Sequence, residues 1–299
     1  MASLKFWIKA ARLRTLPLAL ASIALGGFVA ALHPDYRTFP VILAGITTLF
    51  LQTLSNFAND YGDSKNGIDN AGRIGPKRTV QAGEITPSEM KIAVIFFAAL
   101  SFISGLLLVF LASGLSLLHS LIFVLTGIGA IVAAIKYTVG KNPYGYAGFG
   151  DLFVFLFFGL TGVIGTYILA TKSLNLQVFL PASAMGFLST GVLNLNNMRD
   201  VNNDRANGKN TVVVKLGSKK AFVYHCLLIL LPFVLLLIFN LLNFKSIYQF
   251  SFLILLPLFV VDLVKIHRIP ASAELDPFLK KLAMKTLLLT LVFGICNLI

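Results

Sequence analysis

Long apolar segments separated by short polar stretches dominate the chain. A helix that spans a bilayer needs about 20 mostly apolar residues, and nine segments approach that length. The chain is therefore predicted to be an all-α polytopic membrane protein with nine transmembrane helices around a central cavity. The segments cover approximately residues 16–31, 39–57, 91–112, 117–134, 152–170, 178–195, 221–242, 248–264 and 282–299.

Composition supports a membrane protein and gives no sign of a separate soluble domain. Of the 299 residues, 57% are hydrophobic and 12% are charged, whereas a soluble domain carries about 25% charged residues. The net charge is +13, and the Lys and Arg residues that produce it lie between the apolar segments. We therefore expect these residues to set the membrane topology, and we expect no nucleic-acid partner. Residues 1–299 are predicted to form one transmembrane domain, embedded in membrane lipid, whose oligomeric state the sequence leaves open.

The distribution of Lys and Arg predicts an orientation. Of the 25 cationic residues, all but Arg37, Lys172 and Lys245 fall on one side if successive spans alternate in direction. Cytoplasmic loops are enriched in Lys and Arg. We therefore expect an integral plasma (bacterial inner) membrane protein with a cytoplasmic N-terminus and its C-terminus on the opposite face. Residues 1–14 are basic, amphipathic and contain Trp7, which predicts a short interfacial helix before the first span.

Acidic residues gather in two polar stretches, at the ends of the second and sixth segments. If the helices continue here, Asn56, Asp60 and Asp63 share one face at i, i+4 and i+7. Asn196, Asp200 and Asp204 share another at i, i+4 and i+8. Similar basic tetrads, 77–80 and 209–212, follow the two stretches. This weak repeat predicts two four-helix units plus a ninth helix, with both acidic faces on the cytoplasmic side.

The residue types in these stretches favour a metal–diphosphate site. Carboxylates near hydrocarbon are costly unless they are paired or bound to a cation. Oxygen ligands on facing helices suit Mg²⁺, which bridges readily to substrate phosphates, and nearby Lys and Arg bind diphosphate oxygens. The alternative of two ordinary solvated loops is disfavoured by the matching spacing. An ion-coupled transporter would more typically place its acids near the bilayer midplane.

A third stretch, residues 136–151, is rich in Gly and Tyr between the fourth and fifth segments. Glycines allow tight turns close to a ligand, so Tyr137 and Lys141 are expected to reach the same head group. The competing interpretation of the tyrosines is an interfacial aromatic belt.

Six stretches carry recognisable motifs: 12–17, 56–63, 75–80, 137–140, 145–151 and 196–204. They resemble the motifs of the UbiA superfamily of intramembrane prenyltransferases, over essentially the whole chain. Within that superfamily, the chain most resembles the branch that prenylates 1,4-dihydroxy-2-naphthoate in menaquinone biosynthesis.

The resemblance implies a function and a set of site residues. It implies Mg²⁺-dependent transfer of an isoprenyl chain from its diphosphate to 1,4-dihydroxy-2-naphthoate, with loss of CO₂ and diphosphate, giving a demethylmenaquinol. Asp60 and Asp200 are expected to act in catalysis through the metal, and Tyr137 to stabilise an allylic cation. The expected metal ligands are Asn56, Asp60, Asp63, Asp200 and Asp204; the expected diphosphate-binding residues are Lys141, Lys209, Arg78 and Arg14.

Three alternatives remain open from the sequence. Another enzyme of the same superfamily would use this donor site with 4-hydroxybenzoate, homogentisate or haem as the acceptor. A membrane phosphotransferase for lipid alcohols would typically carry one compact Asp-rich motif. An ion-coupled transporter would move its substrate without releasing diphosphate.

Overall fold

The computed structural model describes residues 2–69, 74–112, 114, 116–269 and 273–299. Within these ranges the chain is helical and contains no strand. Nine helical segments of the described chain are long and apolar enough to cross a membrane, which confirms the predicted fold class. They are Leu4–Ala30, Thr38–Lys65, Pro87–Leu111, Leu117–Lys136, Gly150–Thr171, Leu176–Ala206, Val212–Leu242, Ile247–His267 and Ala273–Leu298.

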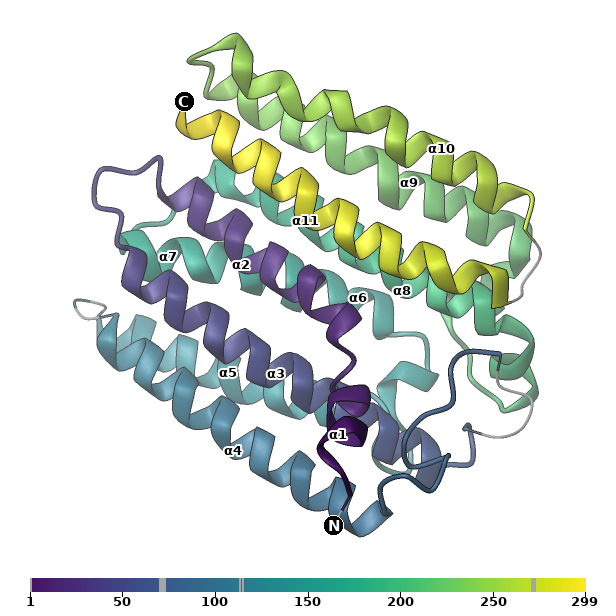
Figure 1. The fold of residues 1–299 in the computed structure, drawn as a ribbon. Helices are drawn as coiled ribbons and strands as arrows, with labels where there is room; N and C mark the ends of the chain where they lie inside the picture. The colour runs from purple at the N-terminus through teal and green to yellow at the C-terminus, as the bar shows by residue number, and fades with distance from the viewer. Residues whose placement is uncertain (1, 70–73, 113, 115, 270–272) are drawn as a thin grey trace.

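The helices run side by side, and the two termini lie toward opposite ends of the bundle (Figure 1). Helix α2 packs against α3, α7, α8, α11 and the π-helix η3, so the first span holds the two halves of the chain together. The main elements are α1 (Leu4–Ala11), α2 (Leu16–Ala30), α3 (Thr38–Lys65), α4 (Pro87–Leu111), α5 (Leu117–Lys136), α6 (Gly150–Val154), η3 (Phe155–Ile164), α7 (Gly165–Thr171), α8 (Phe179–Ala206), α9 (Val212–Leu242), η5 (Ile247–Leu255), α10 (Leu256–His267) and α11 (Asp276–Leu298).

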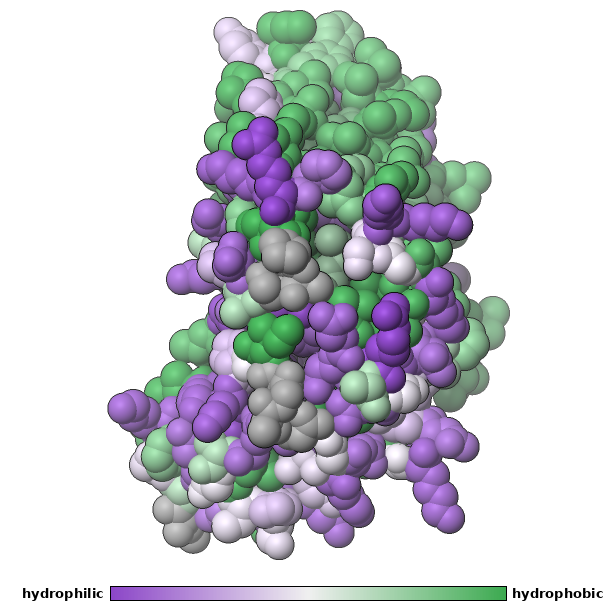
Figure 2. Space-filling view, turned by 90° about the vertical axis from the view of Figure 1, so that its right-hand side faces the viewer, coloured by the Kyte–Doolittle hydropathy of each residue, from purple (hydrophilic) through white to green (hydrophobic). Residues whose placement is uncertain are grey.

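Helices α3 and α8 continue well beyond their apolar segments. Each is 28 residues long, and they end at Lys65 and Ala206. Both acidic stretches are therefore helical, and their side chains are presented on defined helix faces. Figure 2 looks onto the end of the molecule where these helices finish and shows hydrophilic residues gathered across it.

A break at Arg12 separates the N-terminal helix α1 from the first span. Arg12 adopts a left-handed conformation with φ of 50°, which is uncommon for a residue other than glycine. The side-chain amide of Asn56 on α3 donates hydrogen bonds to the Ala11 carbonyl at 2.8 Å and to the Thr15 hydroxyl at 3.0 Å. Trp7 packs edge-to-face on Phe57. A separate helix thus precedes the span, and its location at the membrane surface stays a prediction.

The fifth span contains the π-helix η3, which lies close to its neighbours. A Cβ at Gly162 would be 2.0 Å from the Ser22 hydroxyl, and one at Gly159 would be 2.7 Å from the Gly186 Cα. The Ser22 hydroxyl donates a hydrogen bond to the Phe158 carbonyl. Wide helical turns of this kind are frequent near functional sites, and this one carries Phe157 and Phe158 on the wall of the central cavity.

Candidate active site

A cavity of about 440 Å³ lies between the helices. One end is lined by polar residues of α3, α8 and the loops that follow them, and the remainder by apolar side chains of α4, α5 and η3. The aromatic part of the lining comprises Phe102, Phe123, Phe153, Phe157 and Phe158, with Tyr137, Tyr144 and Tyr146 nearer the polar end. This shape suits a molecule with a charged head and an apolar body.

On α3, the cavity face carries Asn56, Asn59 and Asp63, and Asp69 lines the cavity just beyond the helix. Asp60 does not line it. The Asp60 carboxylate is buried and accepts hydrogen bonds from the Thr79 backbone N–H at 3.1 Å, the Thr79 hydroxyl at 2.6 Å and the Val80 N–H at 3.2 Å. Asp60 thereby fixes the loop that carries Arg78, and the structure does not place it with the other predicted ligands.

On α8, the predicted acidic face lies on the cavity. Asn196, Asp200 and Asp204 all line it. Asp63, and not Asp60, lies on the cavity with them. The correspondence between the two acidic motifs is therefore shifted by three residues on α3 from the one that the sequence predicts. With this shift, Asn59 and Asp63 correspond to Asn196 and Asp200, with the same i, i+4 spacing.

Two cations of the basic tetrads lie among these carboxylates. Arg78 Nη1 is 2.5 Å from Asp63 Oδ2 and 3.4 Å from Asp69 Oδ2. Although burial works to lower the pKa of Arg78, the surrounding carboxylates of Asp63, Asp69 and Asp60 raise it above its usual value. Lys209 Nζ is 3.4 Å from Asp63 Oδ1 and 3.8 Å from Asp204 Oδ1. One ammonium group therefore joins the two acidic motifs.

The other two predicted diphosphate ligands have different surroundings. Lys141 is exposed and does not line the cavity, because the loop after α5 turns its tip to the surface. Arg14 lines the cavity, and its guanidinium donates to Asp276 Oδ2 at 2.9 Å. Of these two predicted diphosphate-binding residues, the structure places Arg14 on the cavity and Lys141 away from it.

Arg199 is a site residue that sequence reasoning missed. Its side chain is fully buried, and it donates to both carboxylate oxygens of Asp200, to Asn196 Oδ1 and to Asp276. Asp276 lies at the start of α11, far away along the chain. The position of Arg199 between Asn196 and Asp200 could have indicated a role in the site. Its ion pair with Asp276 could not be predicted, because Asp276 lies on the last helix, far from Arg199 in the sequence.

Tyr137, the predicted cation-stabilising residue, lines the cavity beside two further tyrosines. Its ring is 5.4 Å from that of Tyr144 in a T-shaped arrangement. Burial raises the pKa of Tyr137, so it stays a neutral phenol. The Tyr146 hydroxyl donates a hydrogen bond to Asp63 Oδ1, and Lys209 Nζ lies 4.6 Å from the Tyr146 ring centroid. Burial and Asp63 raise the pKa of Tyr146 as well.

The donor set at the polar end fits a hard divalent cation. It consists of carboxylate and amide oxygens from two facing helices, the ligands that Mg²⁺ prefers. Lys209 already shows that a positive charge is held between the two motifs. Within the described residues, no three acidic, histidine or cysteine side chains lie close enough to hold a metal by themselves. A metal here would need ligands from amides and from a bound anion as well.

Fold and cavity together define a polytopic helical membrane protein with an acid- and base-lined site at one end of an apolar cavity. The sequence profile of the UbiA prenyltransferase family matches residues 19–289. The chain belongs to this family and is an integral membrane prenyltransferase.

Individual relatives extend over nearly the whole chain. A Haemophilus influenzae protein described as 1,4-dihydroxy-2-naphthoate octaprenyltransferase is 43% identical over 98% of this chain and 95% of its own length. The Escherichia coli K12 protein of the same description is also 43% identical, over 96% and 93%.

Solved structures share the fold. A UbiA homologue from Aeropyrum pernix K1 superposes with a TM-score of 0.68 at 16% identity, covering 94% of this chain and 96% of its own. An Archaeoglobus fulgidus UbiA homologue bound to GPP and Mg²⁺ has a TM-score of 0.67 at 16% identity, covering 98% and 100%.

Proposed function

We propose that the protein transfers an isoprenyl chain from its diphosphate to 1,4-dihydroxy-2-naphthoate in the presence of Mg²⁺. The observation that carries this proposal is the meeting of two acidic helix faces and two partly buried cations at one end of a cavity whose other walls are mostly apolar. The descriptions of the bacterial relatives support the acceptor. The GPP and Mg²⁺ bound to the archaeal homologue support the donor and the metal.

The metal ligands in this proposal follow the register of the cavity. Asn59, Asp63 and Asp69 would bind from one side, and Asn196, Asp200 and Asp204 from the other. When bound, Mg²⁺ would neutralise the oxygens of the leaving diphosphate. Asp60 instead holds the 79–80 loop through three hydrogen bonds, and Asn56 holds the break before α2.

Arg78 and Lys209 are the proposed diphosphate-binding residues. Both are paired with carboxylates in this structure. If those carboxylates held the metal, the oxygens of a diphosphate would be the charged acceptors left for Arg78 and Lys209. Arg14 would act indirectly by holding Asp276, which in turn fixes Arg199 and Asp200. Lys141, being exposed, has no part in this proposal.

The proposed reaction exchanges one bond at the isoprenyl carbon for another. The C1–oxygen bond breaks and its electron pair leaves with diphosphate. The ring carbon that carries the carboxylate then forms a bond to C1. The C–CO₂ bond breaks, and its electron pair restores the aromatic ring, releasing CO₂ and a demethylmenaquinol. No net proton is gained or lost.

The cavity walls would protect the allylic cation. Tyr137 and Tyr144 lie where the polar end meets the apolar part, and their ring faces can stabilise positive charge. Their raised pKa values keep both phenols neutral, so neither becomes a competing anionic nucleophile. The surrounding Phe side chains exclude water, which would otherwise capture the cation.

The proposal is tested with full-length protein in detergent, geranyl diphosphate and a panel of aromatic acceptors. We expect a product with the mass of decarboxylated, geranylated 1,4-dihydroxy-2-naphthoate, formed with Mg²⁺ and abolished by EDTA. Prenylation of 4-hydroxybenzoate or homogentisate but not of the naphthoate would contradict the proposed acceptor. Metal-independent transfer would contradict the proposed metal site.

A further inference from the structure

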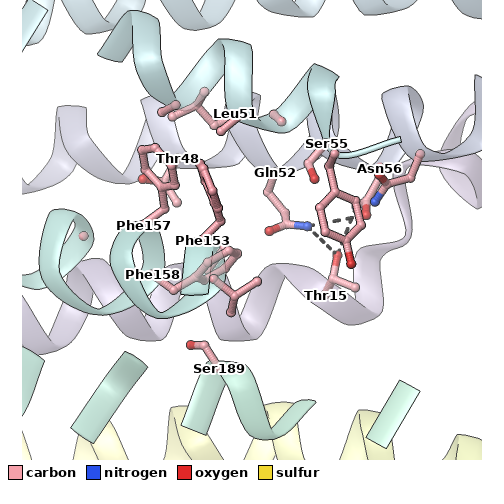
Figure 3. A pocket seen from close by; sticks show the side chains of 18 of the residues that line it. Thr15, Thr48, Leu51, Gln52, Ser55, Asn56, Phe153, Phe157, Phe158 and Ser189 are labelled. Atoms are coloured by element: carbon pink, nitrogen blue, oxygen red, sulfur yellow. Dashed lines mark hydrogen bonds between the residues drawn. The ribbon is translucent and has the colours of Figure 1, made fainter. Parts of the chain in front are cut away.

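Beyond the acidic end, two polar side chains from opposite helices enter the cavity. Gln52 projects from α3 and Ser189 from α8, with Phe153, Phe157 and Phe158 nearby (Figure 3). Neither belongs to the acidic motifs. A polar group in an apolar cavity is costly unless something hydrogen-bonds to it, so each needs a reason.

The Gln52 amide is held in one orientation. The Ala11 carbonyl can only accept, so the Asn56 side chain presents its NH₂ group there, at 2.8 Å. Asn56 Oδ1 is then left to accept from Gln52 Nε2, at 3.4 Å, and the Thr15 hydroxyl also accepts from Nε2, at 3.3 Å. The nitrogen side of Gln52 is thus occupied, and its carbonyl oxygen is turned into the cavity (Figure 3). Gln52 offers a fixed acceptor there.

Ser189 offers an unmatched hydroxyl. Its side chain is 1% exposed and lines the cavity, and its oxygen has no hydrogen-bond partner among the residues that the structure describes. Buried polar atoms are rarely left without a partner unless a ligand or water supplies one. Most helical serines avoid this cost by donating to a carbonyl one turn earlier. The free Ser189 hydroxyl therefore points to a ligand.

The two residues hold equivalent positions in the internal repeat. Gln52 precedes Asn59 by seven residues, and Ser189 precedes Asn196 by seven. Seven residues are two helical turns, or about 10 Å along the axis. Both groups thus lie about 10 Å deeper than the amides of the polar end, on the two sides of the cavity. A diphosphate at that end would place its C1 carbon, and any ring attacking it, between them.

We propose that Gln52 and Ser189 bind the ring hydroxyl groups of the aromatic acceptor. The inference rests on the proposed function and names the residues that select a dihydroxylated ring. The Gln52 carbonyl accepts from one hydroxyl, which also increases electron density on the attacking ring. Ser189 pairs with a second oxygen of the acceptor, and the side chains of Phe153 and Phe157, which line the cavity, border the ring.

The test compares Gln52→Leu and Ser189→Ala with the unchanged protein in steady-state assays. Geranyl diphosphate and 1,4-dihydroxy-2-naphthoate are varied in turn. We expect each variant to raise KM for the naphthoate roughly tenfold, because a site built to hydrogen-bond a hydroxyl loses that contact. KM for geranyl diphosphate should change less than about twofold, as the acidic end is intact.

Acceptor analogues with one hydroxyl replaced by a methoxy group give the specific readout. The unchanged protein should discriminate against them, and Gln52→Leu should lose that discrimination for one of the two analogues. Thr53→Val is the matched control, since Thr53 is the next residue of α3, borders an outer groove and bonds back to the Leu49 carbonyl. It should leave both KM values unchanged.

The outcomes separate the inference from the proposed function. If the unchanged protein prenylates the naphthoate and both variants keep its KM and its discrimination, the inference is overturned and the function stands. If the unchanged protein does not prenylate the naphthoate, the proposed function fails first. A variant that retains its KM for geranyl diphosphate is folded, so a loss confined to the acceptor supports the inference.

Discussion

At the residue scale, neighbouring aspartates of α3 have different surroundings. Asp60 is enclosed by hydrogen bonds from Thr79 and Val80. Asp63 faces the cavity and contacts Arg78, Lys209 and Tyr146. Asp60 therefore has a structural role, because its carboxylate holds the backbone N–H groups of the loop in place. Asp63 is available to bind a ligand, because Arg78 and Lys209 can leave its carboxylate and pair with another anion.

Asp63→Asn and Asp60→Asn should therefore have separable effects. We expect Asp63→Asn to lower kcat/KM for the proposed Mg²⁺-dependent transfer by at least about 100-fold even in protein that remains folded, because a proposed metal ligand is lost. Asp60→Asn should lower the free energy of unfolding by about 1–3 kcal/mol, because it removes an acceptor from buried donors. It should keep activity within about tenfold below its unfolding temperature. Equal loss of activity in both folded variants would argue against this assignment.

At the element scale, the fit of α3 against the loop after α5 depends on one glycine. A Cβ at Gly62 would lie 2.5 Å from the Thr138 hydroxyl and 2.7 Å from the Thr138 carbonyl carbon and oxygen. The Thr138 hydroxyl donates to the Ala58 carbonyl at 3.0 Å, and Asn66 donates to the Thr138 carbonyl at 2.8 Å. This close approach holds Tyr137 at the cavity.

Gly62→Ala should lower the free energy of unfolding by about 1–3 kcal/mol, since the backbone of the loop must shift to accept a methyl group. The measurement is the thermal unfolding midpoint in detergent. Gly45→Ala on the same helix is the matched control, because a Cβ there meets nothing within 4 Å. An equal fall in both variants would mean that helix packing in general, and not the contact with Thr138, responds to the change.

At the scale of the whole molecule, the polar site lies at one end of the bundle and the C-terminus toward the other (Figure 1). The excess of Lys and Arg in the loops at the site end predicts that this end is cytoplasmic. Helix α9 connects the two ends, with exposed Lys219 near its start and exposed Lys245 just after it.

Cysteine labelling in intact cells tests this orientation. Cys226 and Cys296 are first replaced by Ser, and Lys219→Cys or Lys245→Cys is then introduced. A membrane-impermeant maleimide should label Lys245→Cys at once and Lys219→Cys only after the membrane is opened. The reverse pattern would place the site on the outer face and refute the predicted orientation.

The sequence by itself determined the spans and the presence of the two acidic stretches. Hydrophobicity is local, and a bilayer of fixed thickness requires apolar segments of about 20 residues, so nine spans can be counted without a structure. Only the tertiary structure decided which acidic residues meet. Asn56–Asp60 and Asn59–Asp63 share the same i, i+4 spacing, and nothing local distinguishes them.

The rotation of α3 in the bundle turns Asp63 toward the cavity and Asp60 away from it, and the contacts of α3 with other helices set that rotation. In the same way, the ion pairs of Arg199 and Arg14 with Asp276, and the exposure of Lys141, depend on segments far apart in the chain. A pattern of spacing identifies the chemistry that a helix can present. Packing determines the direction in which the helix presents it.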